Sequence, residues 1–324
     1  MGFNLRNLQR LGSSIEVTFP RDEEGFVGRE CPNRNCLGYF KVKPGTGLTG
    51  PDLACHCPYC GHAGRSDTFL TPDQIEYARS LAMRRVGEAL QRDLKGLEFN
   101  HRPRPGSFGI GVSVKFTPGT PVPIRHYRER SLETHITCAK CTLDYAIFGL
   151  FAFCPDCREH NSGQMLEKNL ELIVKQLALA ESQTDADLKR QLTEDALENC
   201  VSAFDGFARE SCRVRGAKSV DPIGAAQISF QNLDRADQRL RTLFQVELST
   251  CLAAHEWQSA RRSFMRRHLL AHRSGVVDEQ YRREAQDPAA ILGRRIAITP
   301  EAVTELIGCV RQLGRALVGR LPGL

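Results

Sequence analysis

The chain has 324 residues, of which 41% are hydrophobic and 25% charged, and its formal net charge is +6. These values are typical of a globular protein of about two domains, and they exclude a fibrous or largely disordered chain. The modest positive charge fits an acidic partner such as nucleic acid, although it is also common in proteins that bind none.

No stretch of the chain approaches the roughly 18 uninterrupted apolar residues that a membrane span needs. The most apolar run, residues 146–153, ends at Cys154, and residues 1–10 lack the apolar core of a signal peptide. We therefore expect a cytoplasmic protein that makes no membrane contact. In a reducing compartment, the 13 cysteines are better suited to metal binding than to disulfides.

The N-terminal half has the pattern of short strands with one helix. Thr71-Pro72-Asp73 has the order of a helix start, with a capping threonine and proline at the first helical position, so we expect a helix to about residue 94. Elsewhere, apolar and polar residues alternate as they do in half-buried strands. The expected strands are residues 13–20, 110–116 and 135–137.

After residue 160 the apolar residues recur at helical spacing. Thr299-Pro300-Glu301 repeats the threonine-proline-acid start, and short loops between helices are typical of a bundle. The expected helices are residues 166–179, 186–213, 236–252, 256–272 and 300–318. We predict an α+β protein with zinc-ribbon segments at residues 1–70 and 71–162 and an all-α bundle at residues 163–324.

Two groups of four cysteines predict two zinc sites built like zinc ribbons. Zinc takes four ligands in a tetrahedron, and two short turns can each supply two thiolates. The second group has two Cys-x2-Cys pairs separated by twelve residues, whereas the first begins with a wider Cys-x4-Cys pair. The expected zinc ligands are Cys31, Cys36, Cys57 and Cys60 in the first group, and Cys138, Cys141, Cys154 and Cys157 in the second.

In the first group, Cys55, His56 and His62 lie close enough in the chain to compete as ligands. His135 and His160 are weaker competitors in the second group. Four thiolates leave no open coordination position, so neither site is expected to be catalytic. Structural zinc stabilises a small domain by on the order of 10 kcal/mol. A surface that grips nucleic acid or protein is the alternative role, and redox-active Cys-x2-Cys pairs are a further alternative.

The fourth expected helix ends in arginines and histidines. His268 and His272 are four residues apart, so about 40° separates them around the helix axis. The long side chain of Arg267 can reach toward the same patch. Cationic residues are also common at helix C-termini simply because they complement the helix dipole.

The hexapeptide Arg267-His268-Leu269-Leu270-Ala271-His272 resembles the signature of HEPN domains, in which an arginine and a polar residue are followed by three residues and a histidine. Residues 273–281 also resemble the continuation seen in HEPN proteins of bacterial defence and toxin systems. The resemblance covers about residues 163–320, half of the chain. It implies a metal-independent endoribonuclease that works as a homodimer through its helical half, with a regulatory or antitoxin protein as a possible partner.

The resemblance also implies roles for the three motif residues. His272 would be the general base or acid, Arg267 would neutralise charge on the phosphorane, and His268 would orient or polarise. RNA carries its own nucleophile, the 2′-hydroxyl, so no catalytic metal is expected and the product would be a 2′,3′-cyclic phosphate. The residues expected to contact the RNA backbone are Arg262, Arg266 and Arg273, with Arg261 beside them.

Two other functions remain open at the level of sequence. The chain could be a non-catalytic adaptor that binds nucleic acid or protein through its ribbons and dimerises through its helical half. It could also be a zinc-ribbon accessory factor of transcription or replication, for which duplex DNA binding with a steep salt dependence would be the sign.

Overall fold

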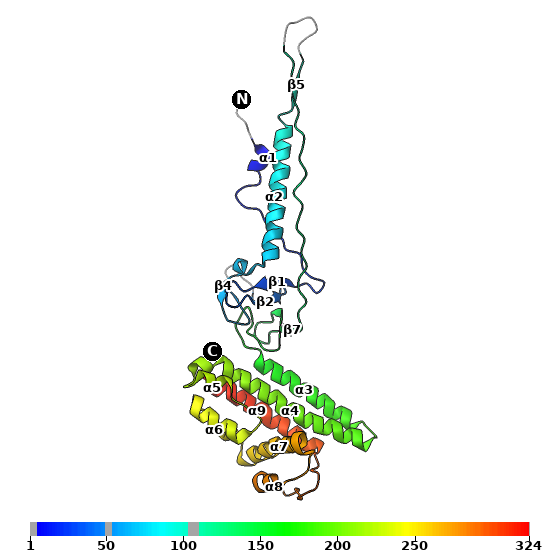
Figure 1. Cartoon of the computed structure of the whole chain (residues 1–324), viewed down its shortest axis with the longest axis vertical. Helices are drawn as coiled ribbons and strands as arrows, with labels where there is room; N and C mark the ends of the chain where they lie inside the picture. The colour runs from blue at the N-terminus through cyan, green and yellow to red at the C-terminus, as the bar shows by residue number, and fades with distance from the viewer. Residues whose placement is uncertain (1–4, 49–53, 103–109, 324) are drawn as a thin grey trace. The chain divides into compact units, whose positions relative to one another are not determined.

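A computed structural model of the chain describes residues 5–48, 54–102 and 110–323 (Figure 1). The chain divides into two compact units, Met1–Glu159 and His160–Leu324. The first unit combines short strands with one long helix, and the second is helical. This confirms the predicted combination of a mixed N-terminal part and a helical C-terminal part. In the described residues, no helix is both long and apolar enough to cross a membrane.

The main sheet of the first unit consists of two hairpins joined edge to edge. Its strand order is β1-β2-β8-β7, and all neighbours are antiparallel. Lys41 pairs with Ala146 and Val42 with Tyr145, and this pairing joins the two hairpins. Both cysteine groups are therefore attached to one sheet. The strands are β1 (Val27–Glu30), β2 (Tyr39–Val42), β7 (Thr134–Thr137) and β8 (Asp144–Ile147).

Two smaller antiparallel ladders complete the strands of the described residues. They join β3 (Ala54–His56) to β4 (Ala63–Arg65), and β5 (Phe99–His101) to β6 (Val112–Val114). The strand expected at residues 110–116 is thus shorter than predicted, and the one at 135–137 is confirmed as β7. The strand expected at residues 13–20 is wrong. That segment has no regular secondary structure and pairs with no described strand, and its Phe19 ring lies 6.4 Å from Tyr77 of a helix.

The long helix of the first unit is α2 (Pro72–Lys95), with the one-turn helix α1 (Arg6–Gln9) beside it (Figure 1). Its predicted start is confirmed. The Thr71 side chain accepts a hydrogen bond from the backbone N–H of Gln74, and the Gln74 side chain accepts one from the backbone N–H of Thr71. Such a capping box satisfies two N–H groups that would otherwise lack partners at the helix start. A 3-10 turn, Ser66–Phe69, precedes the helix.

The second unit is a bundle of long helices with short ones at its edge (Figure 1). The five predicted helices are all present, although 236–252 is divided into a helix and a 3-10 turn. The described helices are α3 (Ser162–Glu181), α4 (Ala186–Val214), α5 (Pro222–Ala226), α6 (Leu233–Phe244), α7 (Ala254–Arg273), α8 (Glu279–Ala285) and α9 (Pro300–Arg320), with 3-10 turns at Gly216–Lys218 and Leu248–Cys251.

Aromatic packing at the centre of the bundle joins α4 to α7. The Phe204 ring contacts Phe230 and Phe264 edge to face, with ring centroids 5.8 Å and 6.1 Å apart. All three side chains are buried, and such pairs add about 0.5–1.5 kcal/mol beyond their area burial. Phe264 is about one helical turn from Arg267, so the core fixes the part of α7 that carries the motif.

Candidate functional site

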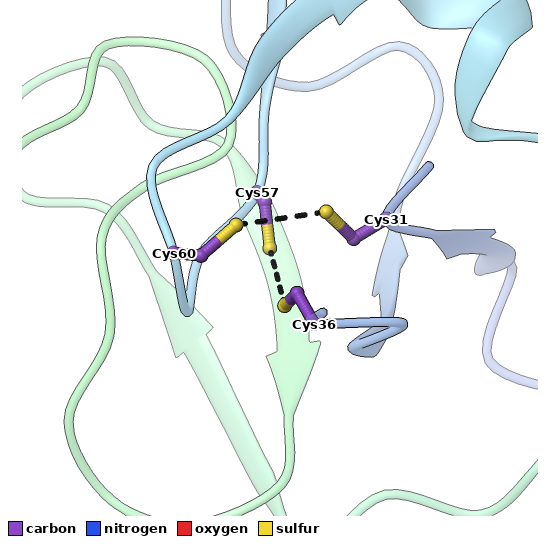
Figure 2. A group of neighbouring side chains, drawn as sticks. All are labelled: Cys31, Cys36, Cys57 and Cys60. Carbon is purple, nitrogen blue, oxygen red and sulfur yellow. Dashed lines mark hydrogen bonds between the residues drawn. The ribbon is translucent and has the colours of Figure 1, made fainter. Parts of the chain in front are cut away.

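The first cysteine group converges as a metal centre would (Figure 2). Cys31 and Cys36 come from the turn between β1 and β2, and Cys57 and Cys60 from the turn between β3 and β4. The four sulfur atoms lie within 4.8 Å of one another, with Cys31–Cys60 at 3.6 Å and Cys36–Cys57 at 3.7 Å. Four sulfurs around one zinc ion, at bond lengths of about 2.3 Å, would be about 3.8 Å apart.

The second cysteine group has the same dimensions. The sulfurs of Cys138 and Cys157 are 3.6 Å apart, and those of Cys141 and Cys154 are 3.5 Å apart. Both groups could hold a metal ion, as predicted, and their four sulfurs suit zinc. The possible competitors stay outside these two groups of neighbouring ligand atoms: Cys55, His56, His62, His135 and His160.

The thiols of these groups differ in acidity in the absence of a cation. At Cys60 and Cys138, burial is outweighed by hydrogen bonds, which lower the thiol pKa. At Cys31 and Cys141, burial prevails and raises the pKa to about 11. A bare thiol with such a pKa stays protonated at neutral pH. A dication bound among the four sulfurs would displace these protons, because metal ligation requires the thiolate.

All four cysteine turns share one backbone pattern. The residue after the second cysteine of each pair has a positive φ: Leu37 (49°), Gly61 (70°), Thr142 (62°) and Arg158 (61°). In each turn the backbone N–H of the first cysteine donates to the carbonyl oxygen of the residue two positions after the second cysteine. Cys57, for example, donates to His62 at 2.8 Å. Of these four residues, only Gly61 could be predicted from the sequence to have a left-handed conformation, since glycine adopts it at no steric cost.

The turns of the two cysteine groups are joined by reciprocal backbone hydrogen bonds. The N–H of His56 donates to the carbonyl of Pro155 at 2.8 Å, and the N–H of Phe153 donates to the carbonyl of Pro58 at 2.9 Å. In each case the donor directly precedes a Cys-Pro-x-Cys turn, and the acceptor is the proline of the other turn. The two centres therefore share one polar connection as well as one sheet.

The candidate catalytic residues lie together at the C-terminal end of α7. The imidazole rings of His268 and His272 are 4.7 Å apart, and both side chains are exposed. The guanidinium of Arg267 is half-buried, and its Nη1 donates to Oε1 of Gln231 at 3.1 Å. Its Nε is buried and has no hydrogen-bond partner among the described residues. Ser274 and Gly275 end the helix with positive φ angles.

A cleft of about 520 Å³ opens beside this end of α7. His268 lines it, as does Gln231, the partner of Arg267. Its apolar floor includes Phe264 and Met265 of α7. The remaining lining comes from residues 227–239, from Arg261 and Leu269 of α7, and from residues 278–284. The charged residues of the lining are Asp234, Arg235, Arg239, Arg261, Asp278 and Glu284.

The charges around the cleft nearly cancel, and His268 is held as a neutral base. Arg261 forms hydrogen bonds with the Asp234 carboxylate, the shortest at 2.6 Å. Partial burial of its ring, followed by the electrostatic effects of His272 and Arg267, lowers the pKa of His268 below its usual value. Its imidazole is therefore neutral at neutral pH and can accept a proton.

The arginines expected to track RNA do not form one free surface. Arg266 forms an internal ion pair with Asp287, its Nη2 lying 2.7 Å from the carboxylate. The same carboxylate accepts a hydrogen bond from the Tyr281 hydroxyl at 2.6 Å. Arg262 donates to the carbonyl of Gln286. Of the three predicted contacts, only Arg273 has an exposed side chain. The segment after α8 thus binds the guanidinium groups of Arg262 and Arg266. Helical spacing in the sequence could not predict these contacts.

Models of known protein families, curated proteins and solved structures were compared with the chain, and none of them matches it.

Proposed function

We propose that the chain is an endoribonuclease of the HEPN kind that cleaves RNA without a catalytic metal and acts as a toxin or antiviral effector. The observation that carries the proposal is the group of Arg267, His268 and His272 beside a nucleotide-sized cleft. Two imidazoles and one guanidinium are the groups that RNA cleavage by its own 2′-hydroxyl requires. Two copies of the motif, one from each protomer of a homodimer, would complete the active site.

The proposed reaction moves one proton off the 2′-oxygen and one onto the 5′-oxygen. The 2′-oxygen forms a bond to phosphorus as the bond from phosphorus to the 5′-oxygen breaks, leaving a 2′,3′-cyclic phosphate and a 5′-hydroxyl. His272 accepts the proton from the 2′-oxygen or supplies the proton to the 5′-oxygen, and the neutral His268 orients His272. The guanidinium of Arg267 binds the phosphorane oxygens.

The cleft suits the base beside the cleaved phosphate. Its charges compensate one another, as the pair of Arg261 and Asp234 illustrates, so it is a poor phosphate site. Its apolar floor with polar edges matches the two faces of an unstacked base, which RNA-binding proteins stack and hydrogen-bond. Arg273, whose side chain is exposed, is the arginine best placed to contact the backbone.

The proposed role of zinc is structural. Each ion would be held by four thiolates, as Cys31, Cys36, Cys57 and Cys60 illustrate, and would stabilise the hairpin ends of the shared sheet. A regulatory or antitoxin protein that restrains the nuclease fits the same proposal, with the N-terminal unit as the reader of a substrate or partner.

The decisive experiment incubates the purified protein with total RNA and maps the ends of any fragments. We expect 2′,3′-cyclic phosphates and 5′-hydroxyls from the wild type, in the presence of a chelator added after folding. His272→Ala and Arg267→Ala should each lower the rate by at least about 100-fold, the size of a lost general acid–base group or charge-stabilising donor. His255→Ala is the matched control, because His255 is an exposed histidine near the start of the same helix. Equal cleavage by all four proteins would refute the assignment.

The adaptor remains the second candidate, and one observation favours it. Exposed cations lie in three of the four cysteine turns, at Arg34, Lys140 and Arg158. They would suit the backbone of a nucleic acid. RNA binding by the wild type with no cleavage, abolished by changing these three residues to alanine, would support the adaptor in place of the nuclease.

A further inference from the structure

The cleft beside α7 combines an apolar floor with two polar walls. The floor includes Phe264 and Met265 of α7, and α7 packs against both α6 and α8, which form the walls (Figure 1). The volume of about 520 Å³ is typical of a small-ligand site, and the apolar floor suits the face of a nucleic-acid base. Which base fits best depends on the hydrogen-bonding groups that the walls leave free.

Several polar side chains of the lining already have partners within the chain. The Asp234 carboxylate lies 2.6 Å from Nη2 of Arg261. The side-chain oxygens of Gln231, Asn232 and Asp278 each accept a hydrogen bond from a neighbouring segment or from their own helix start. Because these oxygens are already partnered, they contribute less to the choice of a base.

Gln280 and Glu284 are the free polar pair on the α8 wall. They are four residues apart, so their side chains are neighbours on one face of the helix. Both line the cleft and both are exposed. Neither side chain forms a hydrogen bond or an ion pair within the described part of the chain. The amide of Gln280 can donate or accept, whereas the carboxylate of Glu284 offers two acceptor oxygens side by side.

Arg235 and Arg239 are the corresponding pair on the α6 wall. They too are four residues apart, and both are exposed and line the cleft. An arginine suits the N7 and O6 acceptors of guanine, whereas adenine has an amino group in place of O6. The three guanidinium groups of the lining are matched by three carboxylates, so the cleft suits a neutral base better than a phosphate.

The free groups of both walls match guanine better than the other bases. Guanine offers two adjacent donors, N1–H and N2–H, to the two oxygens of one carboxylate, with the acceptor O6 beside them. Adenine, cytosine and uracil each place at most one donor against such a carboxylate. A carboxylate that faces one donor and one acceptor loses a hydrogen bond and meets a repulsive oxygen or nitrogen.

We infer that the cleft selects a guanine residue of single-stranded RNA. Glu284 accepts from N1–H and N2–H, Gln280 donates to O6, and an arginine of the α6 wall donates to N7. The inference rests on the proposed role of the cleft as the base site of a ribonuclease. A free guanine nucleotide carries at least two negative charges on its phosphate, for which the balanced lining has no surplus cation. In RNA the backbone can continue outside the cleft.

The test measures how tightly the zinc-loaded full chain binds fluorescent 2′-O-methyl pentanucleotides, which lack the free 2′-hydroxyl and cannot be cleaved. The central base, between uracils, is guanine, adenine or hypoxanthine, which is guanine without its 2-amino group. The wild type should bind the guanine probe at least about 10-fold more tightly than either of the others, as expected for a charged, bidentate contact.

Glu284→Gln should bring the guanine and hypoxanthine probes to within about threefold of each other, because an amide has one acceptor oxygen in place of two. Glu279→Gln is the matched control and should keep the wild-type ratio, since Glu279 is an exposed carboxylate of the same helix outside the lining. Circular dichroism and zinc content would show that all three proteins are folded alike.

The guanine site fails if the wild type binds the three probes equally or binds none of them. It also fails if Glu284→Gln keeps the full preference for guanine over hypoxanthine. Guanosine 5′-monophosphate that displaces the probe at a lower concentration than unlabelled pentanucleotide would identify a free nucleotide as the ligand and overturn the inference for RNA. Binding with the expected preference, but no cleavage of ordinary RNA, would refute the nuclease and leave the guanine site standing.

Discussion

The backbone N–H of His56 donates to the carbonyl oxygen of Pro155 at 2.8 Å, which joins the turn of one candidate metal centre to the turn of the other. The reciprocal bond from Phe153 to Pro58 makes the connection symmetric. These peptide groups hold their geometry only while both Cys-Pro-x-Cys turns are formed. The two centres should therefore load and unload their metals together.

The first prediction is that removing the ligands of one centre empties both. Cys138→Ser/Cys141→Ser should lower the zinc content of the purified protein from about two ions per chain toward none, because structural zinc supplies folding free energy to the turns it binds. Zinc would be measured by elemental analysis after gel filtration. Cys55→Ser is the control and should keep both ions, since Cys55 lies outside both groups. A double variant that retains one firmly bound ion would show that the centres are independent.

The second prediction concerns the titration of His268. Its imidazole should titrate below about pH 6.5, the ordinary pKa of histidine, because burial and the nearby cations lower its pKa. His272→Gln should raise the pH of the midpoint, since it removes the effect of His272 and leaves that of Arg267. The measurement is the pH dependence of the imidazole signals by NMR.

The sign for stability follows from the same pKa. A lowered histidine pKa means that the folded state prefers the neutral imidazole. The stability that His268 contributes is present above about pH 6.5 and is lost as the pH falls below it, as the unfolded state then binds the proton first. A midpoint above pH 6.5 in the wild type would contradict this assignment.

The sequence predicted the two groups of four cysteines and the two threonine-proline helix starts well because both depend on neighbours in the chain. Short Cys-x2-Cys pairs define a turn, and Thr71 and Thr299 cap the helices that follow them. The pairing of Lys41 with Ala146 could not be predicted in the same way. It joins strands of four residues that are about 100 positions apart, and neither strand carries a signal for the other.

The cleft was beyond prediction for a similar reason. Gln231 meets Arg267 across 36 positions of sequence, and nothing in residues 227–232 marks them as neighbours of α7. Helix α8 was not predicted because it is only seven residues long, too short for a periodic pattern. Its contact with Arg266 removed a residue from the expected basic surface, which shows that helical spacing cannot tell a solvated arginine from a buried one.

The third prediction concerns Glu210 and the acid stability of the second unit. Burial opposes its ionisation, but hydrogen bonds from Arg213 and His160 outweigh this and lower the pKa of Glu210 to about 2. Arg213 donates to both carboxylate oxygens, at 2.6 Å and 2.7 Å. The stability from this carboxylate is fully present above about pH 4.5 and is lost as the pH falls toward 2.

Replacing the carboxylate by an amide isolates this effect. Glu210→Gln should lower the free energy of unfolding at pH 7 by about 1–3 kcal/mol, because it removes the charge that accepts the hydrogen bonds of Arg213 and His160. Part of the difference from the wild type should disappear near pH 3. Glu171→Gln, at an exposed position on α3, is the control and should change stability by less than about 0.5 kcal/mol. Equal unfolding curves for wild type and Glu210→Gln at pH 7 would show that the network adds nothing.

The fourth prediction uses two glycines of α9 that should respond in opposite directions. A Cβ at Gly314 would lie 2.7 Å from Cδ2 of Leu166, whose side chain is buried, so α3 and α9 approach closely only because this position lacks a side chain. Gly314→Ala should therefore lower the free energy of unfolding by about 1–3 kcal/mol through overpacking.

Gly308 lies on the same helix, and a Cβ there would meet no atom within 4 Å. Gly308→Ala should raise the free energy of unfolding by about 0.5–1 kcal/mol, because alanine loses less conformational freedom than glycine when a helix forms. Urea denaturation followed by circular dichroism would measure both variants against the wild type. The opposite signs separate packing from helix propensity, since propensity alone would make both variants more stable. A stabilised Gly314→Ala protein would mean that Leu166 moves aside freely and that the contact between α3 and α9 is looser than the structure describes.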